Sequence, residues 1–139
     1  MGRFYSGDIE GKFWFGVQSS DDASAFGGDE IYIDSYGEEV DEDDEDMSEI
    51  AYSFRKEHLD EISETLQDCK LELGENYEKI RDFFRDRDSY TEEMLSEYLG
   101  IEDKMETHNL LKIYARVILG EKIKDCIKKK GECNFTAEL

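Results

Sequence analysis

The sequence predicts an α+β fold, because aromatic strands come first, amphipathic helices follow, and one alternating strand comes last. Residues 2–36 contain short runs of aromatic and β-branched side chains bounded by Gly, Ser and Asp clusters, which is typical of strands and hairpins. From about Lys56 the apolar period changes from two to three or four, as in amphipathic helices. We therefore expect a small antiparallel N-terminal sheet that the C-terminal strand joins, packed against a C-terminal bundle of about four helices.

Length and composition favour a single folded domain over residues 1–139. A chain of this size can bury a core without disulfides or metal. Acidic residues number 37 against 17 basic ones, which leaves a net charge of −20. Disordered segments can be equally acidic, but they contain few aromatic residues. Here 12% of the residues are aromatic, so we expect most of the chain to fold.

Three strands are expected before the acidic run, and they span residues 4–5, 12–18 and 30–34. In the second strand, alternation places Phe13 and Phe15 on one face and Trp14 on the other. We assign Phe13 and Phe15 to the core. Trp14 and Tyr32 are the aromatic candidates for exposure and for partner binding. A further short strand is expected at residues 50–54.

The acidic run at residues 38–49 holds nine carboxylates in twelve positions, and a block of like charge this dense predicts a solvated, mobile loop. The members that we expect to bind a partner are Glu38, Glu39, Asp41, Glu42, Asp43, Asp44, Glu45 and Asp46. A calcium loop that began at Asp41 would need Gly at its sixth position and Glu at its twelfth, where the chain has Asp46 and Tyr52. The calcium motif is therefore absent. Two interpretations remain: the run mimics the phosphates of nucleic acid, or it only solubilises the chain.

Apolar residues at steps of three and four predict a helix from about Lys56 onward. The apolar stripe is Leu59, Ile62, Leu66, Cys69 and Leu73, and the outward acidic residues are Asp60, Glu61, Glu64 and Asp68. Gly74 marks a break, after which an apolar face continues to about Arg85. Because an interior Gly costs only about 1 kcal/mol relative to Ala, the pattern leaves open whether one helix or two span 56–86.

The remaining helices are expected between residues 91 and 130. Capping oxygens and a terminal Gly predict a short helix over 91–99. Residues 107–119 are almost entirely apolar, with Lys112 and Arg116 on one narrow polar stripe, so we expect the central core helix there. After Gly120 the pattern becomes amphipathic, with lysines on the outer side.

The last segment, residues 133–139, alternates polar and apolar side chains with period two after Gly131 ends the preceding helix. Because an isolated terminal strand has nothing to stabilise it, we expect this strand to pair with the N-terminal sheet.

Signals for secretion, membrane insertion and disulfide bonding are absent. The N-terminus lacks a basic region followed by an apolar one, and no run approaches the roughly 18 apolar residues of a membrane span. The three cysteines are odd in number and lack Cys-x-x-Cys spacing, so we interpret them as free thiols in a reducing compartment. These observations predict a cytoplasmic protein with no membrane partner.

Motifs for catalysis or cofactor binding are also absent. His58 and His108 do not lie at zinc spacing from Cys, Asp or each other, and no glycine-rich phosphate motif occurs. The carboxylates that could serve acid–base chemistry all fall in expected turns, where Asp bonds local backbone: Asp8, Glu10, Asp21 and Asp22. We therefore predict no catalytic residue, metal ligand or cofactor, and a binding protein is favoured over an enzyme.

The charge is polarised along the chain. Residues 1–50 carry 16 acidic and 2 basic residues, whereas residues 104–139 carry 5 acidic and 8 basic ones. Direct nucleic-acid binding is disfavoured by the net charge, because only the Lys122–Lys130 edge could contact phosphate.

The opening run Gly2-Arg-Phe-Tyr-Ser-Gly-Asp-Ile-Glu-Gly-Lys-Phe-Trp-Phe-Gly-Val-Gln-Ser-Ser-Asp-Asp-Ala23 resembles the start of small uncharacterised proteins encoded by viruses and phages and their environmental relatives. The likeness covers this run alone and carries over no catalytic residue. It implies a virus-encoded protein that acts inside an infected cell, in the host cytoplasm.

Three functions follow from these observations. The leading hypothesis is a non-enzymatic module whose acidic surface engages a basic site on a partner protein. This surface is expected to centre on residues 38–49 and to be supported by the outward acidic residues Asp60, Glu61, Glu64 and Asp68. The resemblance implies a viral inhibitor or DNA mimic acting on a host protein. An alternative is a nucleotide-like small-ligand binder or small enzyme whose pocket at the N-terminal sheet contains Trp14, Tyr32, Asp8 and Glu10. A third is a structural or oligomeric viral protein, in which the apolar Leu110–Leu119 helix or the C-terminal strand pairs across subunits. The sequence leaves the oligomeric state open.

Overall fold

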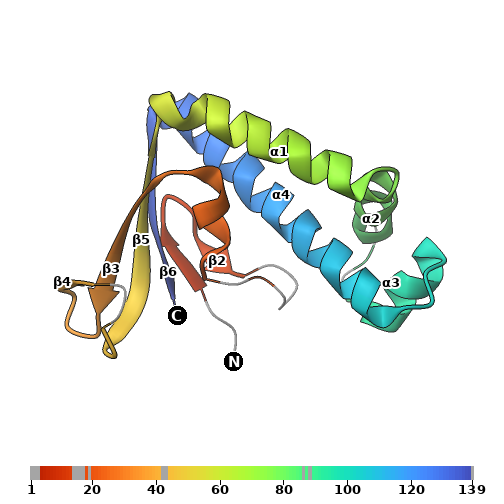
Figure 1. The fold of residues 1–139 in the computed structure, drawn as a ribbon. Coiled ribbons are helices and arrows are strands. Elements are labelled where there is room, and N and C mark those ends of the chain that lie inside the picture. The colour runs from red at the N-terminus through yellow and green to blue at the C-terminus, as the bar shows by residue number, and fades with distance from the viewer. Residues whose placement is uncertain are drawn as a thin grey trace.

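The computed structural model describes residues 4–13, 18, 20–41, 44–85, 87 and 89–138. Within these residues, six strands form one antiparallel sheet and four α-helices lie on one side of it (Figure 1). The α+β prediction is therefore confirmed. Most of the strand expected at 12–18, including Trp14 and Phe15, lies outside the described residues.

The strands are β1 (Phe4–Gly7), β2 (Gly11–Lys12), β3 (Asp29–Asp34), β4 (Glu39–Val40), β5 (Met47–Arg55) and β6 (Glu132–Glu138). Their order across the sheet is β2-β1-β6-β5-β3-β4, and neighbouring strands are antiparallel. The last strand lies between β1 and β5, which confirms that it returns to the N-terminal sheet. Strand β5 begins earlier than the predicted residue 50, because Met47 and Glu49 pair with β3 despite their acidic surroundings in the sequence.

Alternation along the two central strands buries one face of the sheet and leaves the other face open. The buried residues of β5 and β6 are Ile50, Tyr52, Phe54, Cys133, Phe135 and Ala137. Their sequence neighbours, such as Ala51 and Thr136, point to the opposite face, which we call the outer face. The four α-helices all lie on the buried side, so none of them covers the outer face (Figure 1).

Described helical elements are the 3₁₀ turns η2 (Asp22–Phe26) and η3 (Lys56–His58), and the helices α1 (Leu59–Leu73), α2 (Asn76–Arg85), α3 (Glu92–Leu99) and α4 (Lys104–Lys130). The open question of one helix or two is therefore settled as two, α1 and α2, with the break at Gly74. The cap predicted for the next helix is confirmed, because the Thr91 hydroxyl accepts a hydrogen bond from the backbone N–H of Met94 at 3.1 Å. Gly100 ends α3 in the left-handed conformation.

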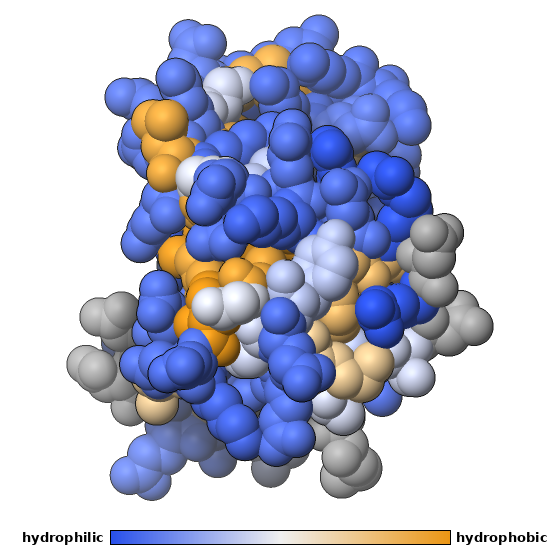
Figure 2. All heavy atoms as spheres, turned by 90° about the vertical axis from the view of Figure 1, so that its right-hand side faces the viewer, coloured by the Kyte–Doolittle hydropathy of each residue, from blue (hydrophilic) through white to orange (hydrophobic). Residues whose placement is uncertain are grey.

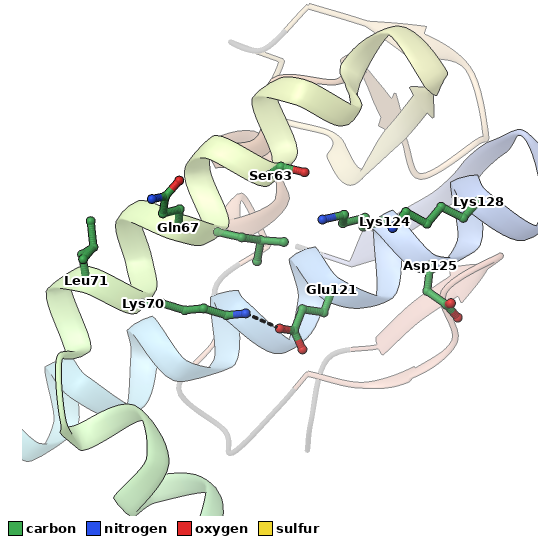
Figure 3. Close-up of a pocket in the computed structure, with 9 residues that line it drawn as sticks. Ser63, Gln67, Lys70, Leu71, Glu121, Lys124, Asp125 and Lys128 are labelled. Carbon is green, nitrogen blue, oxygen red and sulfur yellow. Dashed lines mark ion pairs between the residues drawn. The ribbon is translucent and has the colours of Figure 1, made fainter.

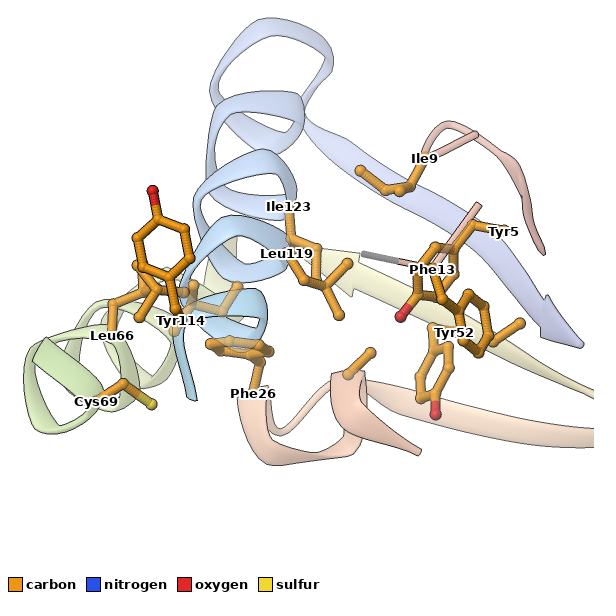
Figure 4. Packing of buried hydrophobic residues seen from close by; sticks show 14 of the residues in the cluster. Tyr5, Ile9, Phe13, Phe26, Tyr52, Leu66, Cys69, Tyr114, Leu119 and Ile123 are labelled. Atoms are coloured by element: carbon orange, nitrogen blue, oxygen red, sulfur yellow. The ribbon is translucent and has the colours of Figure 1, made fainter. Parts of the chain in front are cut away.

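Helix α4 is continuous over 27 residues and joins the predicted core segment to the predicted amphipathic segment. Gly120 lies within this helix. The position requires glycine because a Cβ there would stand 2.4 Å from Cζ of Phe26 and 2.7 Å from Cδ2 of Leu66. The absence of a side chain lets α4 pass close to both η2 and α1. Leu119 and Ile123, both fully buried, point into the core between η2 and the sheet (Figure 4).

The aromatic core of the sheet includes Phe13, as the alternation predicted. Phe13 is buried, and its ring centroid lies 4.3 Å from that of Tyr5. Tyr5 in turn meets Phe135 edge to face, with centroids 5.7 Å apart. Across the described ranges, no helix combines the length and apolarity needed to cross a membrane.

Two elements that we considered for pairing across subunits are occupied within the chain. The apolar stretch Leu110–Leu119 of α4 buries Leu111, Val117 and Leu119 completely or almost completely in the core. Strand β6 has hydrogen-bonded neighbours on both of its sides, β1 and β5. In the described structure, both elements therefore pack against other parts of the same chain.

Candidate functional site

The acidic run forms one end of the sheet, and it contains less loop than the sequence predicted. Its first part includes β4 and its last residues belong to β5. The turn into β4 is fixed by Asp34, whose Oδ1 accepts hydrogen bonds from the backbone N–H groups of Tyr36 and Glu38, both at 2.9 Å. Beyond β4, the Asp44 carboxylate accepts a bond from the N–H of Asp46 at 2.8 Å.

The carboxylates at this end of the sheet form two groups. We call Glu38 and residues 41–46 the acidic tip; Glu42 and Asp43 lie outside the described residues, and the described members are exposed. The second group lies on the outer face, in the row where Glu39 is opposite Ile33, Ile33 is opposite Glu49, and Glu49 is opposite Glu138. The register of the paired strands gives each of these three pairings. We call Glu39, Glu49 and Glu138 the outer acidic row.

The outer acidic row places like charges beside each other. Glu49 and Glu138 are direct cross-strand partners in β5 and β6, and like charges in that position destabilise a sheet. In the part of the chain that the structure describes, no ion pair involves the outer acidic row or the acidic tip. Their mutual repulsion is therefore not offset by a cation from the described chain.

The middle of the outer face is a shallow, mostly uncharged hollow next to the outer acidic row. Its volume is about 470 Å³, and small side chains such as Ser6, Ala51 and Thr136 form much of its lining. Ile31 projects into this region with 44% of its surface exposed. At the far side of the hollow, Asp29 forms an ion pair with Arg55, so charge there is compensated.

The two aromatic candidates do not join this surface. Trp14 lies outside the described residues. Tyr32 faces the buried side of the sheet, where it is half-buried against the core, and its hydroxyl donates to Oε2 of Glu30 at 3.3 Å. Tyr32 is also separated from β1 by β5 and β6, so the structure does not place it in one pocket with Asp8 and Glu10.

The acidic residues expected on the face of α1 are exposed, but they lie on the helical side of the sheet (Figure 1). These residues are Asp60, Glu61, Glu64 and Asp68. They consequently form a surface separate from the outer acidic row, which corrects the expectation that they support it, and they offer a matched control for it.

Asp22 corrects our expectation that this carboxylate makes local turn bonds. It is only 5% exposed, its Oδ1 accepts from Nε of Arg116 at 2.6 Å, and its Oδ2 accepts from the Gln18 amide at 2.7 Å. Burial lowers the pKa of Arg116, but the hydrogen bond and charge of Asp22 outweigh it and raise that pKa. The pair joins η2 to α4 across 94 residues of sequence, a contact that no local pattern indicates.

Both histidines make structural contacts. Nδ1 of His58 accepts a hydrogen bond from the backbone N–H of Arg55 at 2.9 Å. Nδ1 of His108 lies 2.6 Å from Oε1 of Glu92, which links α4 to α3. These contacts give both residues a structural role.

A groove of about 610 Å³ runs between α1 and α4 (Figure 3). Lys70 crosses it and pairs with Glu121, with Nζ and Oε1 2.8 Å apart. Lys124, Asp125 and Lys128 continue the lining, so basic and acidic groups alternate along the groove. Because the lining contains both basic and acidic side chains, the groove does not favour a ligand of either charge, whereas the outer acidic row favours a cationic one.

The end of the molecule formed by α2 and α3 is mostly hydrophilic, with hydrophobic atoms in a band across its middle (Figure 2). Met94 and Tyr98 of α3 are 39% and 48% exposed. Apolar residues exposed singly are common on soluble domains and do not define a site.

No protein-family model, curated protein sequence or solved structure matches the chain.

Proposed function

We propose that this protein is a non-enzymatic binding module whose outer acidic row and acidic tip engage a basic site on a partner protein. The observation that carries the proposal is the direct pairing of Glu49 with Glu138 in a row that also holds Glu39, with no ion pair to a described cation. A lysine or arginine from a partner would relieve this repulsion on binding.

The shape of the outer face fits long basic side chains. Neighbouring strands stand about 4.8 Å apart, so the directly paired Glu49 and Glu138 form a closely spaced anionic pair, and Glu39 lies two strands from Glu49, across Ile33. Beside this row, the hollow lined by Ala51 and Thr136 has one charged residue in its described lining, Asp29, which pairs with Arg55. The apolar stems of Lys and Arg can lie on such a surface while their charged ends reach the carboxylates.

A groove that binds nucleic acid is the kind of basic site that suits this surface. Carboxylates arrayed on a rigid sheet present negative charge in place of backbone phosphates, and long-range attraction would speed the encounter. The partner class that we propose is therefore a nucleic-acid-handling protein, for which this chain would act as a mimic and competitor.

The test compares two variants that lose the same charge. Glu39→Gln, Glu49→Gln and Glu138→Gln together neutralise the outer acidic row, whereas Asp60→Asn, Glu64→Gln and Asp68→Asn neutralise three carboxylates of α1. Each protein is immobilised and used to capture partners from extract of the cells in which it acts. We expect the outer-row variant to lose a captured protein that the wild type and the α1 variant both retain.

The captured protein is then measured by titration at low and at several-hundred-millimolar salt, with duplex DNA as competitor. Affinity should fall with salt, because screening weakens contacts between exposed charges, and DNA should displace this chain. Equal loss in both variants, or affinity that does not change with salt, would contradict the proposal.

A further inference from the structure

Asp8, Cys126 and Cys133 converge where α4 turns into β6. Each residue offers one ligand atom, a carboxylate oxygen or a thiol sulfur, and these three atoms all lie within 4.8 Å of one another. Cys126 belongs to the last turns of α4, Cys133 is the second residue of β6, and Asp8 directly follows β1. The cluster therefore joins three separate elements of the fold.

Two glycines create this convergence. Gly131 adopts a φ of 88°, and its N–H bonds the carbonyl of Ile127 at 2.7 Å, so the chain reverses and brings Cys133 back beside Cys126. Gly7 has a φ of 117°, and a Cβ there would stand 2.7 Å from the carbonyl oxygen of Asn134. A larger residue at position 7 would push β1 away from β6 and would move the Asp8 carboxylate out of the cluster.

The Asp8 carboxylate is held in place by the strand that it faces. The Asp8 N–H donates to the carbonyl of Asn134 at 2.9 Å, and its Oδ2 accepts from the Asn134 N–H at 2.9 Å. Its Oδ1 pairs with Nζ of Lys130 at 3.1 Å. The hydrogen bond from Asn134, and then Lys130, lower the pKa of Asp8. The cluster thus carries a fixed anion and already attracts one cation.

The two sulfurs define which kind of cation fits. Cys133 is fully buried and Cys126 is 9% exposed, and burial raises the pKa of the Cys133 thiol. Uncharged buried thiols are inert, but a coordinated metal ion removes the thiol proton. Two sulfur ligands select thiophilic ions such as Zn²⁺ over Ca²⁺ or Mg²⁺, which prefer oxygen.

We propose that Asp8, Cys126 and Cys133 bind one Zn²⁺ ion through three protein ligands. On binding, each thiol releases its proton to solvent, the two sulfurs and one carboxylate oxygen bond the ion, and the Lys130 ammonium leaves Oδ1 for water. Ligands about 2.0–2.3 Å from a tetrahedral zinc stand about 3.5–4 Å from each other, so the atoms need to approach by only about 1 Å. A cavity of about 250 Å³, lined also by Glu10, adjoins Asp8 and Cys126 and leaves room for a fourth ligand.

Sequence spacing gave no sign of this cluster. Cys126 and Cys133 are separated by six residues and do not form a Cys-x-x-Cys motif, and Asp8 lies near the other end of the chain. We predicted no metal ligand because such motifs describe ligands on one short segment, whereas this cluster depends on β1 lying beside β6.

The experiment uses the full chain, freed of metal by a chelator and kept reduced by a phosphine. Cd²⁺ serves as the optical probe because bonds to thiolate give an ultraviolet charge-transfer band, and Zn²⁺ then competes for the same site. We expect one ion per chain and a melting temperature that rises with Zn²⁺ concentration. Absence of the band, or binding only at millimolar Zn²⁺, would overturn the proposal.

The third cysteine provides the matched control. Cys69 is buried in α1 and is not a member of the cluster, so Cys69→Ser should retain the site. Cys126→Ser and Asp8→Asn should each weaken Zn²⁺ binding by more than about tenfold, which is at the lower end of what loss of an outer-sphere partner costs metal sites.

Asp8 is exposed and Cys126 is 9% exposed, so substitutions there disturb the core less than Cys133→Ser, which is at a fully buried position and risks unfolding. Circular dichroism verifies that each variant is folded. Equal weakening in Cys69→Ser and Cys126→Ser, or unchanged binding in folded Asp8→Asn, would exclude this ligand set.

Discussion

Two carboxylates on the helical side of the sheet, Asp22 and Glu121, differ from those of the outer acidic row in how their charge is compensated. On the helical side, Asp22 bonds Arg116 and Glu121 bonds Lys70, at 2.6 and 2.8 Å. On the outer face, Glu49 and Glu138 are opposite one another, and no ion pair with a described residue involves either. Asp22 and Glu121 thus hold elements of this chain together, whereas the outer acidic row opposes the pairing of its own strands.

This difference separates structural charge from charge that is available to a partner. The attraction within an ion pair of the chain stabilises the folded state, so replacing one member of the pair should lower the free energy of unfolding. Removing one of two neighbouring like charges that have no ion pair should raise the free energy of unfolding. The main effect of such charges should be on association with a partner. The sign of a stability change therefore tests which role a carboxylate has.

The largest expected effect is at Asp22. Asp22→Ala should lower the free energy of unfolding by about 1–3 kcal/mol, because the Arg116 guanidinium and the Gln18 amide both lose this buried acceptor. Urea unfolding measures the change. Glu64→Gln, at an exposed position on α1, is the control and should stay within about 0.5 kcal/mol of the wild type. Similar losses in both variants would show that Asp22 has no special structural role.

A smaller effect of opposite sign is expected in the outer acidic row. Glu49→Gln or Glu138→Gln should raise the free energy of unfolding by about 0.2–1 kcal/mol at low salt, because either change removes the cross-strand repulsion. The double variant should gain less than the sum of the two, and high salt should reduce every gain. A loss of stability in Glu49→Gln would mean that this carboxylate has a stabilising partner within the chain, as Asp22 does.

The smallest effect concerns Glu93 and Lys104, an exposed pair whose Oε1 and Nζ are 2.8 Å apart. The hydrogen bond from Lys104 lowers the pKa of Glu93, so the folded state favours the ionised carboxylate. This contribution to stability is fully present above the pKa that Glu93 has in the unfolded chain. It is lost as the pH falls through the lower pKa that Glu93 has in the folded state. Glu93→Gln should slightly flatten the acid side of the stability profile, measured as the urea midpoint against pH. Superimposable profiles would show that the pair adds nothing to stability.

Local patterns predicted most of the secondary structure. The steps of three and four from Leu59 to Leu73 match α1, and the alternation after Gly131 matches β6. The early start of β5 was missed because Met47 and Glu49 lie in an acidic run, and their strand conformation depends on pairing with β3. The break at Gly74 was left open because one glycine is compatible with either one helix or two.

The candidate surface was predicted only in part. Glu39 belongs to the acidic run that was predicted to bind a partner, but Glu49 lies at the end of this run and Glu138 lies in a different segment. Their meeting depends on the strand order, which places β6 beside β5. Tyr32 was expected to be exposed, yet its strand register turns it toward the core.

The sequence by itself determined the net charge, the helical and strand periods, and the turns and caps, because these depend on residues within a few positions of each other. Only the tertiary structure decided which charges have partners. Asp22 and Arg116 are 94 residues apart, and Asp8 and Lys130 are 122 apart. Electrostatic interaction depends on distance and burial in space, so the same carboxylate can hold the fold together or remain available to a partner.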